Sequence, residues 1–362
     1  MKTGISINEL ATQVKANRAR IRDFDVDTRS LAMDPASGRF TLSARENEVL
    51  TVDGNSLFHS QVADRLGIPS KYYDRMREQE PGLLAQNVNT WLHDKPERRL
   101  VRTYSPQAAS PAMGVDRSVP SLGRAFLSDR YRPLDNFAMM EAILPPLFDS
   151  GLTVASSQIT DERLYLQLVT EKIQAEICPN EHVRVNDPVQ LGLVVSNSET
   201  GCGALTISLM VYRLVCRNGL IVAEEDSGFR KAHLGGRIFA ESDVYLTQAT
   251  RQKKDDALWS EARDVITAGV TQANLDRLVK KIEGVAQVKL DDPVKTVELV
   301  SDRYGFNDDE RDSIMKHLIS GGDPTKWGLV NAITRTAEDA PSYDRAIELE
   351  AIGGKYMMTG NN

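Results

Sequence analysis

Cysteine is scarce in this 362-residue chain, which contains only three, at wide spacing. Three distant cysteines cannot form a disulfide framework, and no CxxC pair is present to hold zinc. This cysteine usage is typical of a reducing compartment, so we expect a cytoplasmic protein without a structural metal.

Long apolar runs are also missing from the sequence. No stretch approaches the roughly 20 apolar residues that cross a bilayer, and the N-terminal MKTGISINELATQV lacks the apolar core of a signal peptide. The hydrophobic content of 41% and the charged content of 26% are those of a globular chain. We therefore expect no membrane partner. The length of the chain suits about two domains of ordinary size.

Common catalytic and nucleotide-binding motifs are absent. The chain has no GxxxxGK[ST], complete GxGxxG, GxSxG or HExxH, and its five histidines occur singly. Asp23, Asp25 and Asp27 have the spacing of calcium ligands but lack the loop's glycine and glutamate, so an acidic edge strand explains them better. The sequence thus favours a protein without metal or cofactor, and it leaves enzyme activity open but less favoured.

The most apolar long segment, Val189–Val222, predicts the core of the fold. Runs 189–195, 204–215 and 220–222 are rich in Val, Ile and Leu, and turn residues at 197–201 separate the first two. This pattern is typical of strands joined by a hairpin. Arg213 in the second run and Arg217 at its exit each need a buried carboxylate or an opening to solvent. Both interpretations, a core ion pair and an anion site at the strand end, stay open.

Periodicity predicts the elements around this core. Strands are expected at 40–52, 152–158 and 163–171, and helices at 7–24, 134–148, 243–284, 292–304, 308–319 and 325–336, with Pro145-Pro146 ending the second helix. Residues 59–76 have the spacing of a helix-turn-helix, centred on Gly67. We predict an α+β fold: a central antiparallel sheet flanked by helices, with a small N-terminal part and a helical C-terminal region. The expected segments are 1–95, 96–240 and 241–362.

Charge is distributed unevenly along the chain. The net charge is −7, so a nucleic-acid site must be a local patch. Residues 95–132 hold eight basic residues against three acidic ones, with aromatic residues among them, and 228–237 is a second basic cluster. Arginines meet phosphates and rings stack on bases, although an internal ion-pair network around Arg124 and Arg130 explains part of the same pattern. The predicted nucleic-acid-binding residues are Arg102, Arg117, Arg124, Arg130, Tyr131, Arg132, Arg217, Arg230, Lys231 and Arg237.

Three blocks carry a family resemblance. They are GRAFLSDRYRPLDN (Gly123–Asn136), SNSETGCGALTISLMVYRLVCRNGL within the core segment, and WGLVNAITRTAED (Trp327–Asp339). In this order they resemble proteins carried by phages, prophages and conjugative plasmids, often called phage/plasmid-like proteins. The resemblance runs from roughly Ser56 to Met357 and implies no particular activity. The order of helix, strand meander and long helix is also similar in outline to phage single-strand annealing recombinases.

Three functional hypotheses follow. The first is a homo-oligomer that binds single-stranded DNA through the 95–132 and 228–237 segments, in annealing or recombination. The second is a counter-defence protein whose acidic surface binds a host defence protein. The third is a nucleic-acid-modifying enzyme centred on Cys216 or on carboxylates, although a packed, inert thiol is the simpler interpretation of each cysteine.

Overall fold

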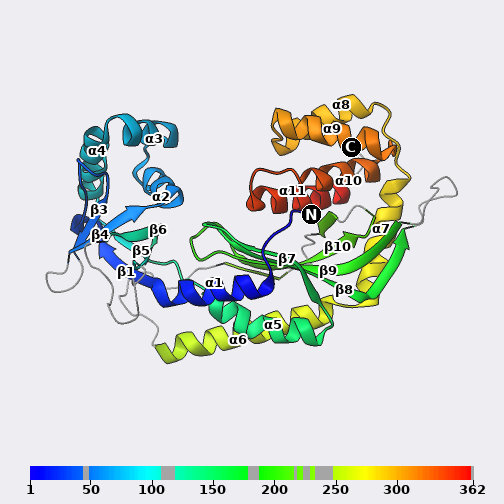
Figure 1. The fold of residues 1–362 in the computed structure, drawn as a ribbon, viewed down its shortest axis with the longest axis horizontal. Helices are drawn as coiled ribbons and strands as arrows, with labels where there is room; N and C mark the ends of the chain where they lie inside the picture. The colour runs from blue at the N-terminus through cyan, green and yellow to red at the C-terminus, as the bar shows by residue number, and fades with distance from the viewer. Residues whose placement is uncertain are drawn as a thin grey trace.

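The computed structural model describes residues 1–43, 49–106, 119–177, 187–215, 218–222, 229–232 and 248–359. Over these ranges the chain has an α+β fold with two mostly antiparallel sheets and a helical C-terminal region (Figure 1), which confirms the predicted fold class.

The first sheet lies in the N-terminal lobe. Its strands run in the order β1-β5-β6-β4-β3-β2, and only the β4–β6 pair is parallel. The strands are β1 (Ile21–Asp27), β2 (Leu31–Met33), β3 (Phe40–Ser43), β4 (Val49–Gly54), β5 (Arg98–Tyr104) and β6 (Ser121–Ser128), with a 3-10 turn at Thr28–Ser30. Because β5 and β6 complete this sheet, it extends beyond the boundary expected near residue 95. The three aspartates of β1 lie on an edge strand, as expected.

Three helices complete the N-terminal lobe: α2 (Ser56–Leu66), α3 (Ser70–Gln79) and α4 (Pro81–Asp94). Gly67 ends α2 in the left-handed conformation, φ 68°, which favours glycine. The turn then places Ile68, Tyr73 and Met76 in the same apolar core as Phe58. The predicted pair of helices joined by a turn at Gly67 is confirmed.

The second sheet holds the apolar segment that the sequence singled out. Its main order is β11-β10-β9-β8-β7, and β12 pairs with β10. The strands are β7 (Thr153–Ile159), β8 (Leu164–Ile177), β9 (Asp187–Asn197), β10 (Leu205–Arg213), β11 (Asn218–Val222) and β12 (Phe229–Lys231). The β9–β10 hairpin turns at Ser198–Ala204, which confirms the predicted hairpin.

Helices cover both faces of the second sheet (Figure 1). On one side lie α1 (Ile7–Arg20), α5 (Asn136–Asp149) and α6 (Gln248–Gly269), and on the other lie α10 (Lys326–Thr336) and α11 (Tyr343–Met358). α7 (Gln272–Ala286) packs along β8, and α8 (Pro293–Tyr304) and α9 (Asp308–Gly321) complete the C-terminal region. Trp259, Ala262 and Ile266 of α6 face the core.

Some helix ends differ from the predictions. α5 continues through Pro145 and Pro146 to Asp149, so the expected stop was wrong. A proline removes one N–H from the helix ladder, and here the Arg263 Nε–H donates to the carbonyl of Ala142, four residues before Pro146, at 3.3 Å. The first predicted helix ends at Arg20, where β1 follows.

Two C-terminal helices begin within one residue of their predicted starts. Asn307 caps α9, which begins at Asp308, and Thr325 caps α10, which begins at Lys326. The last helix, α11, was not predicted at all.

Leu209 gives a test of the core. It lies at the centre of β10 between Leu193 and Val222 and is 2% exposed. Leu209→Ala should lower the free energy of unfolding by about 2–5 kcal/mol, because the cavity cannot close completely. The matched control is Leu299→Ala at a 60% exposed site on α8, which should change it by less than about 0.5 kcal/mol. Equal effects in urea unfolding would contradict the assigned burial.

Candidate nucleic-acid interface

The predicted binding residues divide into three groups in the structure. Arg117, Arg217 and Arg237 lie outside the described residues. Arg102 and Arg124 are buried. Arg130, Tyr131, Arg132, Arg230 and Lys231 lie on or near the surface.

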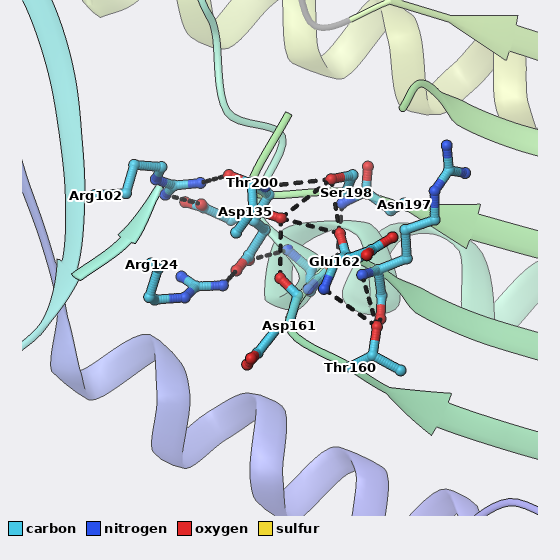
Figure 2. A network of polar contacts seen from close by, with 12 residues as sticks. Arg102, Arg124, Asp135, Thr160, Asp161, Glu162, Asn197, Ser198 and Thr200 are labelled. Carbon is cyan, nitrogen blue, oxygen red and sulfur yellow. Dashed lines mark hydrogen bonds and ion pairs between the residues drawn. The ribbon is translucent and has the colours of Figure 1, made fainter. Parts of the chain in front are cut away.

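Arg102 and Arg124 are the centre of a buried ion-pair network (Figure 2). Arg102 donates to Asp23 at 3.0 Å, to Asp135 at 3.1 Å and to the Glu199 carbonyl at 2.7 Å. Arg124 donates to the Glu199 carboxylate at 2.8 Å. Both side chains are enclosed and paired with protein acceptors, so neither presents its charge to a phosphate in this structure. The internal ion-pair interpretation, made for Arg124 and Arg130, holds for Arg124, and Arg102 joins the same network. Arg130 is exposed instead.

Glu199 belongs to the β9–β10 turn, whose first part, residues 198–200, is buried although it is polar. Its second carboxylate oxygen accepts the backbone N–H of Asn136, the first residue of α5, at 2.7 Å. A carboxylate at a helix N-terminus satisfies a free N–H and complements the helix dipole. The turn therefore fixes the start of α5 as well as the two arginines.

Other residues of the same turn bind the β7–β8 turn and the N-terminal lobe. The Thr200 hydroxyl donates to the carbonyls of Asp161 and Glu162, each at 3.0 Å (Figure 2). Gln61 of α2 donates to the Thr200 carbonyl at 2.7 Å. The turn lies in the sequence block that begins SNSETGCG, one of the three blocks that carry the family resemblance. This block therefore joins the N-terminal lobe to the part of the molecule that contains the second sheet, which we call the C-terminal lobe.

The Tyr131 side chain packs at the contact between the two lobes, so its ring is not free to stack on a base. Its hydroxyl donates to the Ser198 carbonyl at 2.8 Å and accepts the Gly201 N–H at 3.3 Å. Burial raises the pKa of the phenol above its usual value. The side chain instead anchors the segment that carries Arg130 and Arg132.

Arg132 and Lys231 meet in one cavity, although almost one hundred residues separate them in the sequence. The cavity has a volume of about 370 Å³, and Lys254 of α6 supplies a third basic side chain. Asp255 pairs with Arg132, and Glu261 lies 4.0 Å from Lys231. The structure therefore brings the two predicted basic segments together here, and we call this cavity the lysine pocket. Its described lining residues are Arg132, Leu134, Lys231, Ala232, Lys254, Asp255, Ala257, Leu258 and Glu261.

A second cavity, of about 490 Å³, lies on the N-terminal lobe, and we call it the arginine pocket. Four guanidinium groups line it, from Arg65, Arg98, Arg99 and Arg130. The first three are absent from the predicted binding residues. Arg98 and Arg99 belong to the basic segment 95–132, so the charge pattern could have identified them as binding residues. Arg65 lies about thirty residues earlier, on α2, and the charge pattern gave no indication of it.

Key side chains of the helix-turn-helix pair are buried, and the one cysteine among the described residues is partly buried, so they contribute to packing rather than to an open site. The His59 ring and the Tyr73 hydroxyl, 2.9 Å apart, are buried between α2 and α3, and burial lowers the pKa of His59 to about 4. Burial raises the pKa of the Cys202 thiol, while Cys178 and Cys216 lie outside the described residues. Arg213 pairs with Asp187, as the core ion-pair interpretation expected.

Neither a metal cluster nor a membrane span is found in the ranges that the structure describes. No three His, Cys, Asp or Glu side chains gather there as potential ligands. No described helix combines the length and apolar character of a membrane-spanning segment.

Comparison with known proteins places the chain in a family. The family model described as Domain of unknown function (DUF932) matches residues 125–340. The chain belongs to this family. The DUF932 match contains Glu199, the segment 130–132 and the lysine pocket, whereas Arg65, Arg98 and Arg99 of the arginine pocket precede it. Comparisons with curated proteins and with solved structures gave no match.

A further buried carboxyl lies close to the end of the DUF932 match, on α11. Glu350 is fully buried, its carboxylate accepts a hydrogen bond from Gln167 at 2.6 Å, and Gln167 in turn accepts one from the Tyr343 hydroxyl at 2.9 Å. Burial raises the pKa of Glu350 from 4.5 to about 8. The helix therefore docks on the sheet through a carboxyl that prefers its neutral form.

Glu199→Gln tests the joint between the lobes. The change leaves Arg124 buried without a counter-charge, so the free energy of unfolding should fall by about 3–5 kcal/mol. Glu78→Gln, at an exposed position on α3, should change it by less than about 0.5 kcal/mol. A Glu199→Gln variant as stable as this control in chemical unfolding would contradict the assigned role.

Glu350→Gln tests the docking of α11. Between pH 4.5 and about 8 the folded state keeps a proton on Glu350 that the unfolded chain releases, so the wild-type protein loses stability as pH rises. The amide does not titrate. The variant's stability relative to wild type should therefore increase from pH 5 to pH 8, by at most about 1.4 kcal/mol per pH unit. Glu348→Gln, on the same helix and 59% exposed, should show no such trend in urea unfolding.

Proposed function

We propose that the protein binds single-stranded DNA through its phosphate backbone, in the DNA metabolism of a phage, prophage or conjugative plasmid in the bacterial cytoplasm. One observation supports this most: Arg132 and Lys231, from the two segments predicted to bind DNA, line the same lysine pocket with Lys254. The resemblance of three sequence blocks to phage/plasmid-like proteins supports the biological setting.

The charges of the lysine pocket suit a chain of single phosphates. Three basic side chains face two carboxylates, so the pocket carries a small positive excess within a protein of net charge −7. A duplex presents a much denser charge than a single strand, and the acidic remainder of the surface would repel it more strongly. A local cationic pocket therefore favours a single strand.

Backbone contacts also imply low sequence specificity. No aromatic side chain is among the residues described around either pocket, and the Tyr131 hydroxyl is held by the β9–β10 turn. Phosphate contacts position a nucleic acid without reading its bases. A pocket of this size contacts few nucleotides, so we further propose that several copies of the chain act together on one strand, because linked sites gain avidity.

The lysine pocket offers a matched pair of variants. Lys254 lines it and its neighbour Lys253 does not, although both side chains are exposed on α6. Binding of a circular single-stranded DNA should weaken with salt at a slope of about 0.7 in log affinity per phosphate contact. Lys254→Gln should lower that slope by about 0.7, whereas Lys253→Gln should leave it unchanged. The measurement is fluorescence anisotropy or filter binding over a salt series.

Two outcomes would contradict the proposal. The first is wild-type protein with no affinity for the circular strand at low salt, which would favour the alternative of a host defence protein as partner. The second is an equal effect of the two lysine variants, since a diffuse attraction to any surface lysine would then explain the binding.

A further inference from the structure

The arginine pocket forms where three elements of the N-terminal lobe end or begin. Arg65 comes from the last turn of α2, Arg98 and Arg99 from the start of β5, and Ser128 and Arg130 from the end of β6 and the turn after it. Strand pairing fixes this meeting point, because Arg99 and Ser128 are direct partners in the β5–β6 ladder. The pocket is therefore built on paired strands and a helix.

Glu97 holds two of the four arginines in place. Both its oxygens accept hydrogen bonds from Arg65, and one of them also accepts from Arg99, at 2.7 and 2.6 Å. A guanidinium has five N–H donors in a planar fork, so each arginine keeps donors beyond those that Glu97 uses. Such a pre-organised fork is suited to phosphate oxygens.

The other two arginines are nearer to solvent. Arg98 is about half exposed and pairs with Asp25 of the edge strand at 2.8 Å. Arg130 is exposed and forms no ion pair within the described part of the chain. The Arg130 guanidinium is therefore available to an incoming anion.

The lining of the pocket carries two more positive than negative charges. Four guanidinium groups face the carboxylates of Glu97 and Asp129. A phosphate diester carries one negative charge, whereas a phosphate monoester carries about −1.5 to −2 at pH 7 and three acceptor oxygens. Asp25, outside the lining, also pairs with Arg98, so the surplus that a ligand meets is one to two charges. The four guanidinium groups can donate to all three terminal oxygens of a monoester, whereas a diester offers only two.

The volume of the pocket admits more than a phosphate group. About 490 Å³ lies within the usual range for sites that hold small organic ligands. The described lining has no aromatic ring to stack on a base, so the rest of the ligand would be held loosely.

We propose that the arginine pocket binds a phosphate monoester, either the terminal phosphate of a nucleic-acid strand or that of a free nucleotide. This site is separate from the lysine pocket and goes beyond backbone binding, because a monoester occurs at a strand end and not within a strand. This proposal does not depend on strand binding at the lysine pocket, because a free nucleotide could bind the arginine pocket without contacting the lysine pocket.

Titration calorimetry of the full chain with small ligands tests the pocket directly. Thymidine 5′-monophosphate should bind measurably, and thymidine, which lacks the phosphate, should not. Arg130→Gln and Arg98→Gln should each weaken binding of the monophosphate about tenfold, as expected for one lost charge-assisted hydrogen bond. The control is Arg39→Gln, because Arg39 is a similarly exposed arginine of the same lobe, paired with Asp53 at 3.2 Å outside the pocket. It should leave the affinity unchanged.

Oligonucleotides distinguish the two sources of the phosphate. If the ligand is a strand end, a short oligothymidylate with a 5′- or 3′-terminal phosphate should bind about tenfold more tightly than the same oligomer without it, and Arg130→Gln should abolish that gain. If the ligand is a free nucleotide, the monophosphate should bind and the terminal phosphate should add no affinity. Both results support the pocket.

The proposal is overturned if neither the monophosphate nor a terminal phosphate improves binding over the phosphate-free ligands. It is also overturned if Arg39→Gln weakens binding as much as Arg130→Gln. A circular strand has no terminal phosphate, so the effect of Lys254→Gln on its binding tests the lysine pocket without any contribution from a strand end. The two proposals can therefore fail separately.

Discussion

The structure depends on one buried contact, the pairing of Arg124 and Arg102 with the β9–β10 turn. The turn presents Glu199 and its neighbouring carbonyls to both arginines, and the same carboxylate receives the first N–H of α5. Charges removed from water must be paired to be tolerated, and the turn supplies acceptors for both buried arginines where the first sheet meets the second. The position of the β6–α5 segment, and hence of Arg130 and Arg132, follows from that joint.

The main strands of the second sheet and most helices could be predicted because their periodicity is local, whereas β5 and β6 of the first sheet were not predicted. The β9–β10 hairpin and the core face of α6 follow from short apolar patterns. The burial of the turn could not be predicted in this way. Residues 197–201 have the composition of a solvent-exposed loop, yet Asn197, Ser198 and Thr200 are almost inaccessible, because their partners come from distant segments of the chain.

In the candidate interface, too, the local sequence pattern identified the segment, but contacts with distant parts of the chain decide what each residue does. The reversal of charge in residues 95–132 directed attention to a segment that lines both pockets. A charge count cannot separate a buried arginine such as Arg102 from an exposed one such as Arg130. Tyr131 lies between arginines, as a stacking residue would, and its role is set instead by two hydrogen bonds to the turn. Arg65 joins the arginine pocket only through the packing of α2 on the first sheet.

We propose that a single DNA strand lies against the lysine pocket. Acetylation of surface lysines, with and without saturating circular single-stranded DNA, measures this most directly when each site is quantified by mass spectrometry. The account predicts that DNA protects Lys231 and Lys254 but leaves Lys253, one residue away on the same helix, as reactive as before. Protection of all three to the same degree, or of none, would contradict it.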